Sequence, residues 1–159
     1  YAPGSHLRFV GNTVTQQNPS SNGLIFGGVG RVTMEDNTAE VLGAYSPTPV
    51  ALTFAAEEGH LDVVATGNTF TNYGSALYFY DRATTEFGID ATLTGNTFDF
   101  PITAAPQVVT LENIGTAIVA TDNQWGDNTS LAAVQGYVSY TGLTGARGGS
   151  IDLDPITVP

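Results

Sequence analysis

The sequence contains no cysteine and no lysine, and only four arginines stand against fifteen carboxylates. Without cysteine the chain has neither a disulfide scaffold nor a thiolate metal site. A net charge of −11 with four scattered cations argues against nucleic-acid binding, because such a surface does not neutralise a phosphate backbone. Apolar runs are also too short for a membrane-spanning helix. The sequence therefore indicates much about the architecture of the protein and little about its activity.

What the chain has in excess is Thr, Gly and Asn, which occur 22, 19 and 10 times in 159 residues. At 42% hydrophobic residues it can bury a core, so it is not a disordered acidic tail. The length suits a single domain. A lysine-free composition rich in Thr, Asn and Gly is typical of secreted and surface proteins, so we expect an extracellular or cell-surface location.

A repeat centred on Asn runs through the chain. Positions five before, three before and two after each central Asn are apolar, and polar residues alternate with them, which predicts half-buried strands. Gly or Asp always precedes the Asn, as a sharp bend with positive φ requires. The central asparagines are separated by 25, 31, 28 and 27 residues; they are Asn12, Asn37, Asn68, Asn96 and Asn123.

A second apolar column lies between the Asn turns. It is formed by the segments 24–26, 52–54, 77–79 and 109–111, which share one in-out-in pattern. Each period of about 28 residues therefore carries two predicted strands, a tight turn and a variable loop. One such unit cannot bury its own apolar face, so we expect successive units to stack as parallel sheets around a shared core.

The predicted fold is all-β: a right-handed parallel β-helix of about five coils in one domain, residues 1–159. The coils span about 1–125, and a closing segment with a short helix near 130–138 spans 126–159. Stacked Asn side chains are expected to hydrogen-bond along the axis as an amide ladder. These five asparagines are thus assigned a structural role.

The repeated Gly-Asn-Thr-Phe at 67–70 and 95–98 resembles the core of the right-handed, pectate-lyase-like parallel β-helix family. The stretch from Asn123 to Gly126, followed by 149–156, resembles the end of many such domains. The resemblance implies the fold and the C-terminal part of such a domain. It does not imply one function, because this fold serves many.

Enzymes of that family act on polysaccharides with acids or calcium ligands along one sheet. Glu58, Asp81 and Arg82, which follow the second apolar column, are therefore the candidate catalytic residues, with Glu57, His60, Glu86 and Glu112 nearby. Carboxylates in neighbouring coils can meet the separation used in glycoside hydrolysis. The alternative is that solvent-facing turns of an acidic protein simply carry carboxylates. The family's lyase chemistry also expects several basic residues, and only Arg82 is close.

The sequence predicts no metal site and no cofactor. His6 and His60 are far apart, and no His/Asp cluster with ligand spacing is evident. Tyr78 and Tyr80 fall on the outward side of their predicted strand, with Tyr73 in the nearby turn. We expect these tyrosines to contact a carbohydrate or a protein partner.

Residues 1–14 already look like part of a coil, without an evident cap. An uncapped coil exposes strand edges, so we expect self-association or a preceding β-helix segment as the partner. The leading functional hypothesis is a non-catalytic extracellular structural module in a surface filament, fibre or adhesin. The alternatives are the C-terminal portion of a polysaccharide lyase, hydrolase or tailspike, and a carbohydrate-binding module.

Overall fold

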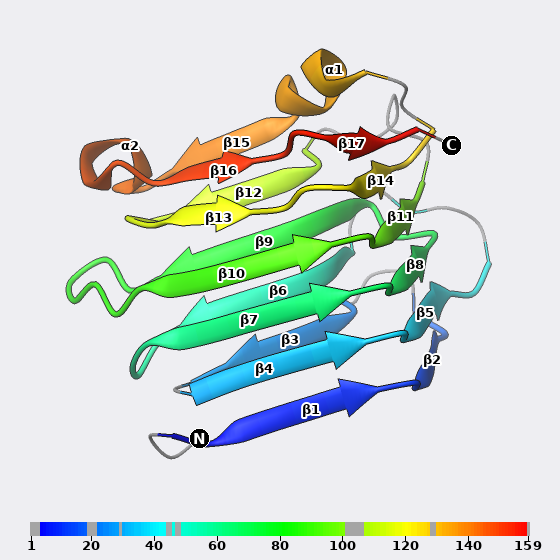
Figure 1. The fold of residues 1–159 in the computed structure, drawn as a ribbon, viewed down its shortest axis with the longest axis horizontal. Helices are drawn as coiled ribbons and strands as arrows, with labels where there is room; N and C mark the ends of the chain where they lie inside the picture. The colour runs from blue at the N-terminus through cyan, green and yellow to red at the C-terminus, as the bar shows by residue number, and fades with distance from the viewer. Residues whose placement is uncertain are drawn as a thin grey trace.

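Three parallel β-sheets wind around one apolar core in the computed structural model (Figure 1). The structure describes residues 4–18, 22–28, 30–43, 46, 49–100, 107–127 and 130–158. Every paired strand is parallel to its neighbours and belongs to an adjacent coil. The predicted fold class, an all-β parallel β-helix, is therefore confirmed.

The three sheets take their strands in strict rotation. Sheet A contains β1 (His6–Val10), β4 (Gly30–Glu35), β7 (Leu61–Thr66), β10 (Ile89–Thr94), β13 (Ala117–Val119) and β16 (Ser150–Asp152). Sheet B contains β2 (Thr13–Gln16), β5 (Thr38–Val41), β8 (Thr69–Thr71), β11 (Thr97–Asp99), β14 (Asn123–Trp125) and β17 (Ile156–Thr157). Sheet C contains β3 (Leu24–Gly27), β6 (Val50–Ala56), β9 (Ser75–Asp81), β12 (Val109–Glu112) and β15 (Val138–Thr141).

Each coil thus has three strands, whereas the sequence predicted two. The residue before the central Asn breaks the strand because it adopts a left-handed conformation, with φ of 64°, 53°, 67°, 66° and 57° at Gly11, Asp36, Gly67, Gly95 and Asp122. The chain bends sharply there, and the strand that carries the apolar residue two positions after Asn belongs to another sheet. The expected turn was placed correctly, but the strand beyond it was merged with the first.

The central asparagines form a continuous ladder just inside this bend. The Nδ2 of each Asn donates to Oδ1 of the Asn in the following coil at 3.1, 2.7, 2.8 and 2.9 Å. The backbone N–H of the same residue donates to the same oxygen at 2.8–3.0 Å. From Asn37 onward, Nδ2 also reaches a backbone carbonyl of the preceding coil. The ladder satisfies polar groups that the bend would otherwise leave buried and unpaired.

Aromatic side chains stack along the core in two columns. Phe26, Phe54 and Phe79 lie with ring centroids 5.8 and 5.4 Å apart beneath sheet C. Phe70, Phe98 and Trp125 stack beneath sheet B at 5.3 and 5.0 Å. In-register pairing places similar residues over one another, so equivalent positions of successive repeats stack along the solenoid axis.

The C-terminal segment extends the solenoid. Helix α1 (Leu131–Gln135) is capped by Ser130, whose hydroxyl accepts a hydrogen bond from the Ala133 N–H at 3.3 Å. Strand β15, helix α2 (Thr144–Arg147), β16 and β17 follow, and the three strands add one further layer to sheets C, A and B (Figure 1). The expected short helix near 130–138 is present, although it is shorter.

The ladder predicts unequal costs for removing its members. Asn68 is fully buried, and Asn68→Ala would orphan the donors of Asn37 and two backbone carbonyls. We expect a loss of about 3 kcal/mol or more in the free energy of unfolding, measured by urea denaturation. Asn12→Ala is the matched control at the partly exposed end of the ladder and should cost about 1 kcal/mol or less. Equal losses at the two positions would contradict a buried, cooperative ladder.

Candidate functional site

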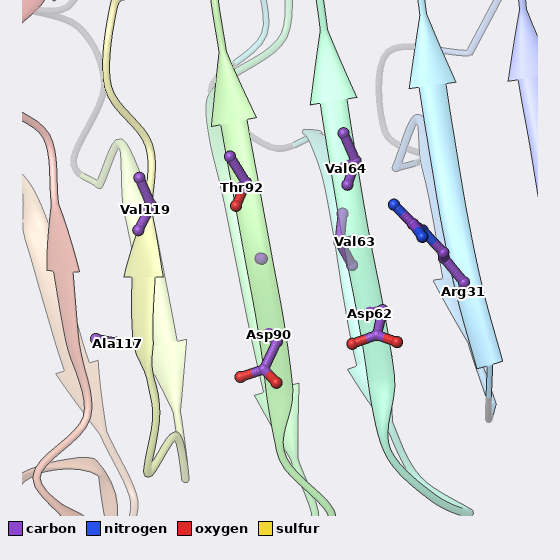
Figure 2. Close-up of a pocket in the computed structure, with 9 residues that line it drawn as sticks. Arg31, Asp62, Val63, Val64, Asp90, Thr92, Ala117 and Val119 are labelled. Carbon is purple, nitrogen blue, oxygen red and sulfur yellow. The ribbon is translucent and has the colours of Figure 1, made fainter.

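The outer face of sheet A carries the densest group of charged side chains that the strand register brings together. Arg31, Asp62 and Asp90 occupy one row across β4, β7 and β10. They line a groove of about 380 Å³ together with Val63, Val64, Ala91, Thr92, Ala117 and Val119. Figure 2 shows the two carboxylates side by side on neighbouring strands, with the guanidinium of Arg31 extended toward Val64, farther along β7 than the Asp62 carboxylate. The row follows from one-coil spacings of 31 and 28 residues.

His60 completes this group from the connection that enters β7. Its Nε2 lies 3.1 Å from Oδ1 of Asp62 and 3.2 Å from Oδ2 of Asp90. Its Nδ1 lies 3.2 Å from the carbonyl oxygen of Phe87, in the neighbouring coil. Gly88 permits this approach, because a Cβ there would stand 3.1 Å from Nδ1 and its φ is +85°. One imidazole therefore joins two carboxylates in different coils.

The electrostatics of the group favour the imidazolium form of His60. Partial burial lowers the pKa of His60, but the hydrogen bonds to Asp62 and to the Phe87 carbonyl, with the charges of Asp90 and Asp62, raise it. The net pKa lies above its ordinary value. The side chains remain 46% exposed for His60, 54% for Asp62 and 66% for Asp90, so solutes reach the group freely.

This cluster corrects the expectation that the chain has no His/Asp grouping with ligand spacing. One nitrogen of His60 and one carboxylate oxygen each of Asp62 and Asp90 lie within 4.8 Å of one another. The signal was present in the sequence as His60-x-Asp62 followed by Asp90 one coil later. Detecting it needed the exact register of sheet A, because a shift of one residue would turn Asp90 toward the core.

Asp81, expected in a solvent-facing turn, is instead fully buried. Its carboxylate accepts hydrogen bonds from the backbone N–H groups of Arg82, Phe87 and Gly88 at 2.7, 3.1 and 3.0 Å. Arg147 approaches it from α2 at 3.9 Å. The residue thus holds the loop between β9 and β10, including the carbonyl that contacts His60.

The other catalytic candidates do not join Asp81 in a site. Glu58 and Arg82 are exposed, and among the described residues neither side chain forms a hydrogen bond or ion pair with Asp81. Glu86 pairs at 3.7 Å with Arg147, and Glu112 accepts a hydrogen bond from Tyr78. Glu86 thus shares Arg147 with Asp81, whereas Glu112 belongs to a separate contact.

The three tyrosines are separated by the sheet. Tyr73 is fully buried and packs edge-on against Phe70 at 6.3 Å, so it is a core residue and not a surface contact. Burial raises the pKa of its hydroxyl. Tyr78 and Tyr80 are half-buried on the outer face of β9, as expected. Burial, followed by the hydrogen bond to Glu112 and its charge, raises the pKa of Tyr78.

No protein-family model matches this chain, and comparisons with curated proteins and with solved structures find no match. The fold is therefore stated from the chain's own sheets and register. Within the described residues, no helix has the length and apolar character needed to cross a membrane.

Asp81 is predicted to be structural. Asp81→Ala would leave three backbone N–H groups without their acceptor, which should lower the free energy of unfolding by about 3 kcal/mol. Glu58→Ala removes the same charge from an exposed position and should change stability by about 0.5 kcal/mol or less. Urea denaturation of both variants tests this difference, which a merely solvated Asp81 would not produce.

Proposed function

We propose that the chain is a non-catalytic structural β-helix module, related to the right-handed pectate-lyase-like solenoids. It would serve as a subunit or domain of an extracellular filament, fibre or adhesin. In this role it grows by receiving a further β-helical coil on its first coil. The observation that carries the proposal is the incomplete burial of that coil's inward-facing column.

Inward side chains of the first coil are exposed where their counterparts are covered. Leu7, Phe9 and Val14 are only half-buried, although they pack against the core. Their register partners in the second coil, Val32, Met34 and Ala39, are 2%, 0% and 0% exposed. Another coil in the same register would bury the first column as the second is buried now. Burial of this apolar surface would stabilise the contact, as it does between neighbouring units of repeat proteins.

The Asn ladder is also open at this end and has a direction. Each Asn donates toward the C-terminal coil, so every Oδ1 except the first receives two hydrogen bonds from the coil before it. Among the described residues, none donates to Oδ1 of Asn12. A preceding coil with Asn at the same place would supply both donors. The open end is therefore complementary to the repeat itself.

In a solution of the isolated protein, the partner for the first coil is a second copy of this chain. Strands β1, β2 and β3 are the edges of the three sheets at one end, and β16, β17 and β15 are the edges at the other (Figure 1). Pairing of these opposite edges gives a head-to-tail contact, which propagates as a filament. Because the catalytic candidates Glu58, Asp81 and Arg82 do not converge, no observation favours the enzyme alternative.

Blocking the edge of β1 should abolish association. Arg31 N donates to Ser5 O, and Gly11 N donates to Glu35 O. By alternation along the strand, the N–H of Val10 then faces the open edge. Val10→Pro removes this donor at an edge position where proline is tolerated. We expect wild-type protein to associate with rising concentration in sedimentation velocity, and the variant to remain monomeric.

Val10→Thr is the matched control, since it keeps the N–H and a β-branched side chain at a position that is 44% exposed. It should associate as the wild type does. A wild-type chain that stays monomeric at its highest soluble concentration would refute the proposed assembly.

A further inference from the structure

We propose that His60, Asp62 and Asp90 bind one divalent transition-metal cation, with Zn²⁺ as the representative, on the outer face of sheet A. The site is separate from the assembly surface on the first coil and does not depend on the proposed function. Three observations carry it: the spacing of the ligand atoms, the support behind the imidazole, and the unusual stacking of the two carboxylates.

The two distances from Nε2 of His60 to the carboxylate oxygens fit a single small cation, and the three ligand atoms lie within 4.8 Å of one another. Two ligands bound at about 2.1 Å lie about 3.0 Å apart in octahedral and about 3.4 Å apart in tetrahedral geometry. Nε2 of His60 is 3.1 and 3.2 Å from the nearest oxygens of Asp62 and Asp90. Small rotations of exposed side chains would thus complete a three-ligand face. Water from the adjoining groove would fill the remaining positions.

The imidazole of His60 has the outer support that metal-binding histidines use. With Nδ1–H donating to the Phe87 carbonyl, the Nε2 lone pair faces the two carboxylates. The Phe87 segment is itself fixed, because buried Asp81 accepts hydrogen bonds from the N–H groups of Phe87 and Gly88. This chain of contacts fixes the ring without using either carboxylate ligand. A mixed nitrogen and oxygen ligand set favours Zn²⁺ over the hard cations Ca²⁺ and Mg²⁺.

The pairing of Asp62 with Asp90 places two negative charges side by side, which a bound cation would stabilise. Among the strand pairs of the described residues, this is the one register pair that places carboxylate beside carboxylate. Like charges directly opposite on neighbouring strands destabilise a sheet. Arg31 is the next residue in the row, but its guanidinium extends toward Val64, farther along β7 than the Asp62 carboxylate (Figure 2). The positive charge that balances the two carboxylates therefore lies at or beside Nε2 of His60.

The alternative occupant of that position is a proton. An imidazolium at His60 bridges both carboxylates at the same distances and explains the geometry without a metal. The groups facing His60 are Asp62 and Asp90, while His6 and Arg31 line the adjoining cavity of about 420 Å³. Direct binding of the metal ion separates the two explanations.

The test is calorimetric titration of Zn²⁺ into the chelator-treated full chain. We expect saturable binding of one ion per chain, and a fall of about tenfold or more in affinity for His60→Gln and for Asp90→Asn. His6→Gln and Glu58→Gln are the matched controls and should bind as the wild type does. The first removes the other histidine, and the second removes one negative charge from the same connection.

Thermal unfolding gives a second readout on the same variants. Zn²⁺ should raise the Tm of the wild type and both controls, because a ligand that binds only the folded chain stabilises it. At the same Zn²⁺ concentration, the Tm of the two ligand variants should rise less. Ca²⁺ and Mg²⁺ should bind more weakly than Zn²⁺. No saturable Zn²⁺ binding, equal affinity in His60→Gln, or Ca²⁺ binding that matches Zn²⁺ would each overturn the site. The ligand side chains are exposed, so their replacement leaves the core intact.

Discussion

The structure depends on the hydrogen bonds that the central asparagines make across the bend between sheets A and B. A left-handed residue turns the chain there and would leave inward polar groups without partners. The side-chain amide takes the place of the missing strand ladder, since it accepts from the coil before and donates to the coil after. Water cannot substitute, because Asn68 and Asn123 are fully buried. The ladder thus links neighbouring coils in register at the bend.

The register of the strands in turn determines which side chains become neighbours on the outer faces of the sheets. Because equivalent residues lie over one another, a side chain on the outer face is surrounded by residues about one period away in sequence. Elsewhere a carboxylate in an outer column has neutral neighbours, as Glu40 has between Thr15 and Thr71. The Thr file on sheet B carries no charge in Thr13, Thr38, Thr69 and Thr97. This arrangement avoids repulsion in a chain of net charge −11. The Asp62–Asp90 pair departs from it, and there His60 approaches.

The columns were predictable from sequence because burial acts on each of them in every coil. The Asn spacing, the alternation before it and the Gly or Asp at the bend sufficed for the fold class. The third strand was missed because β8 and β11 have only three residues each, too few for a recognisable alternation. Positions in the loops were less predictable, since no repeated constraint acts on them. Tyr73 in a connection and Asp81 at the end of β9 both looked like turn residues, yet both are buried.

The same reasoning explains why the His60 group escaped detection while the Asn ladder did not. A ladder repeats, so five weak signals reinforce one another; a site occurs once, and its parts lie on different coils. Asp62 and Asp90 are 28 residues apart, a spacing that has meaning only after the repeat is known. His60 lies outside the strand pattern, and the Phe87 carbonyl that its ring contacts belongs to a different loop, which Asp81 holds. In a solenoid, a site on the outer face thus combines residues that are one coil apart in sequence with residues from the connecting loops. The register of the coils must be known before such a site can be recognised.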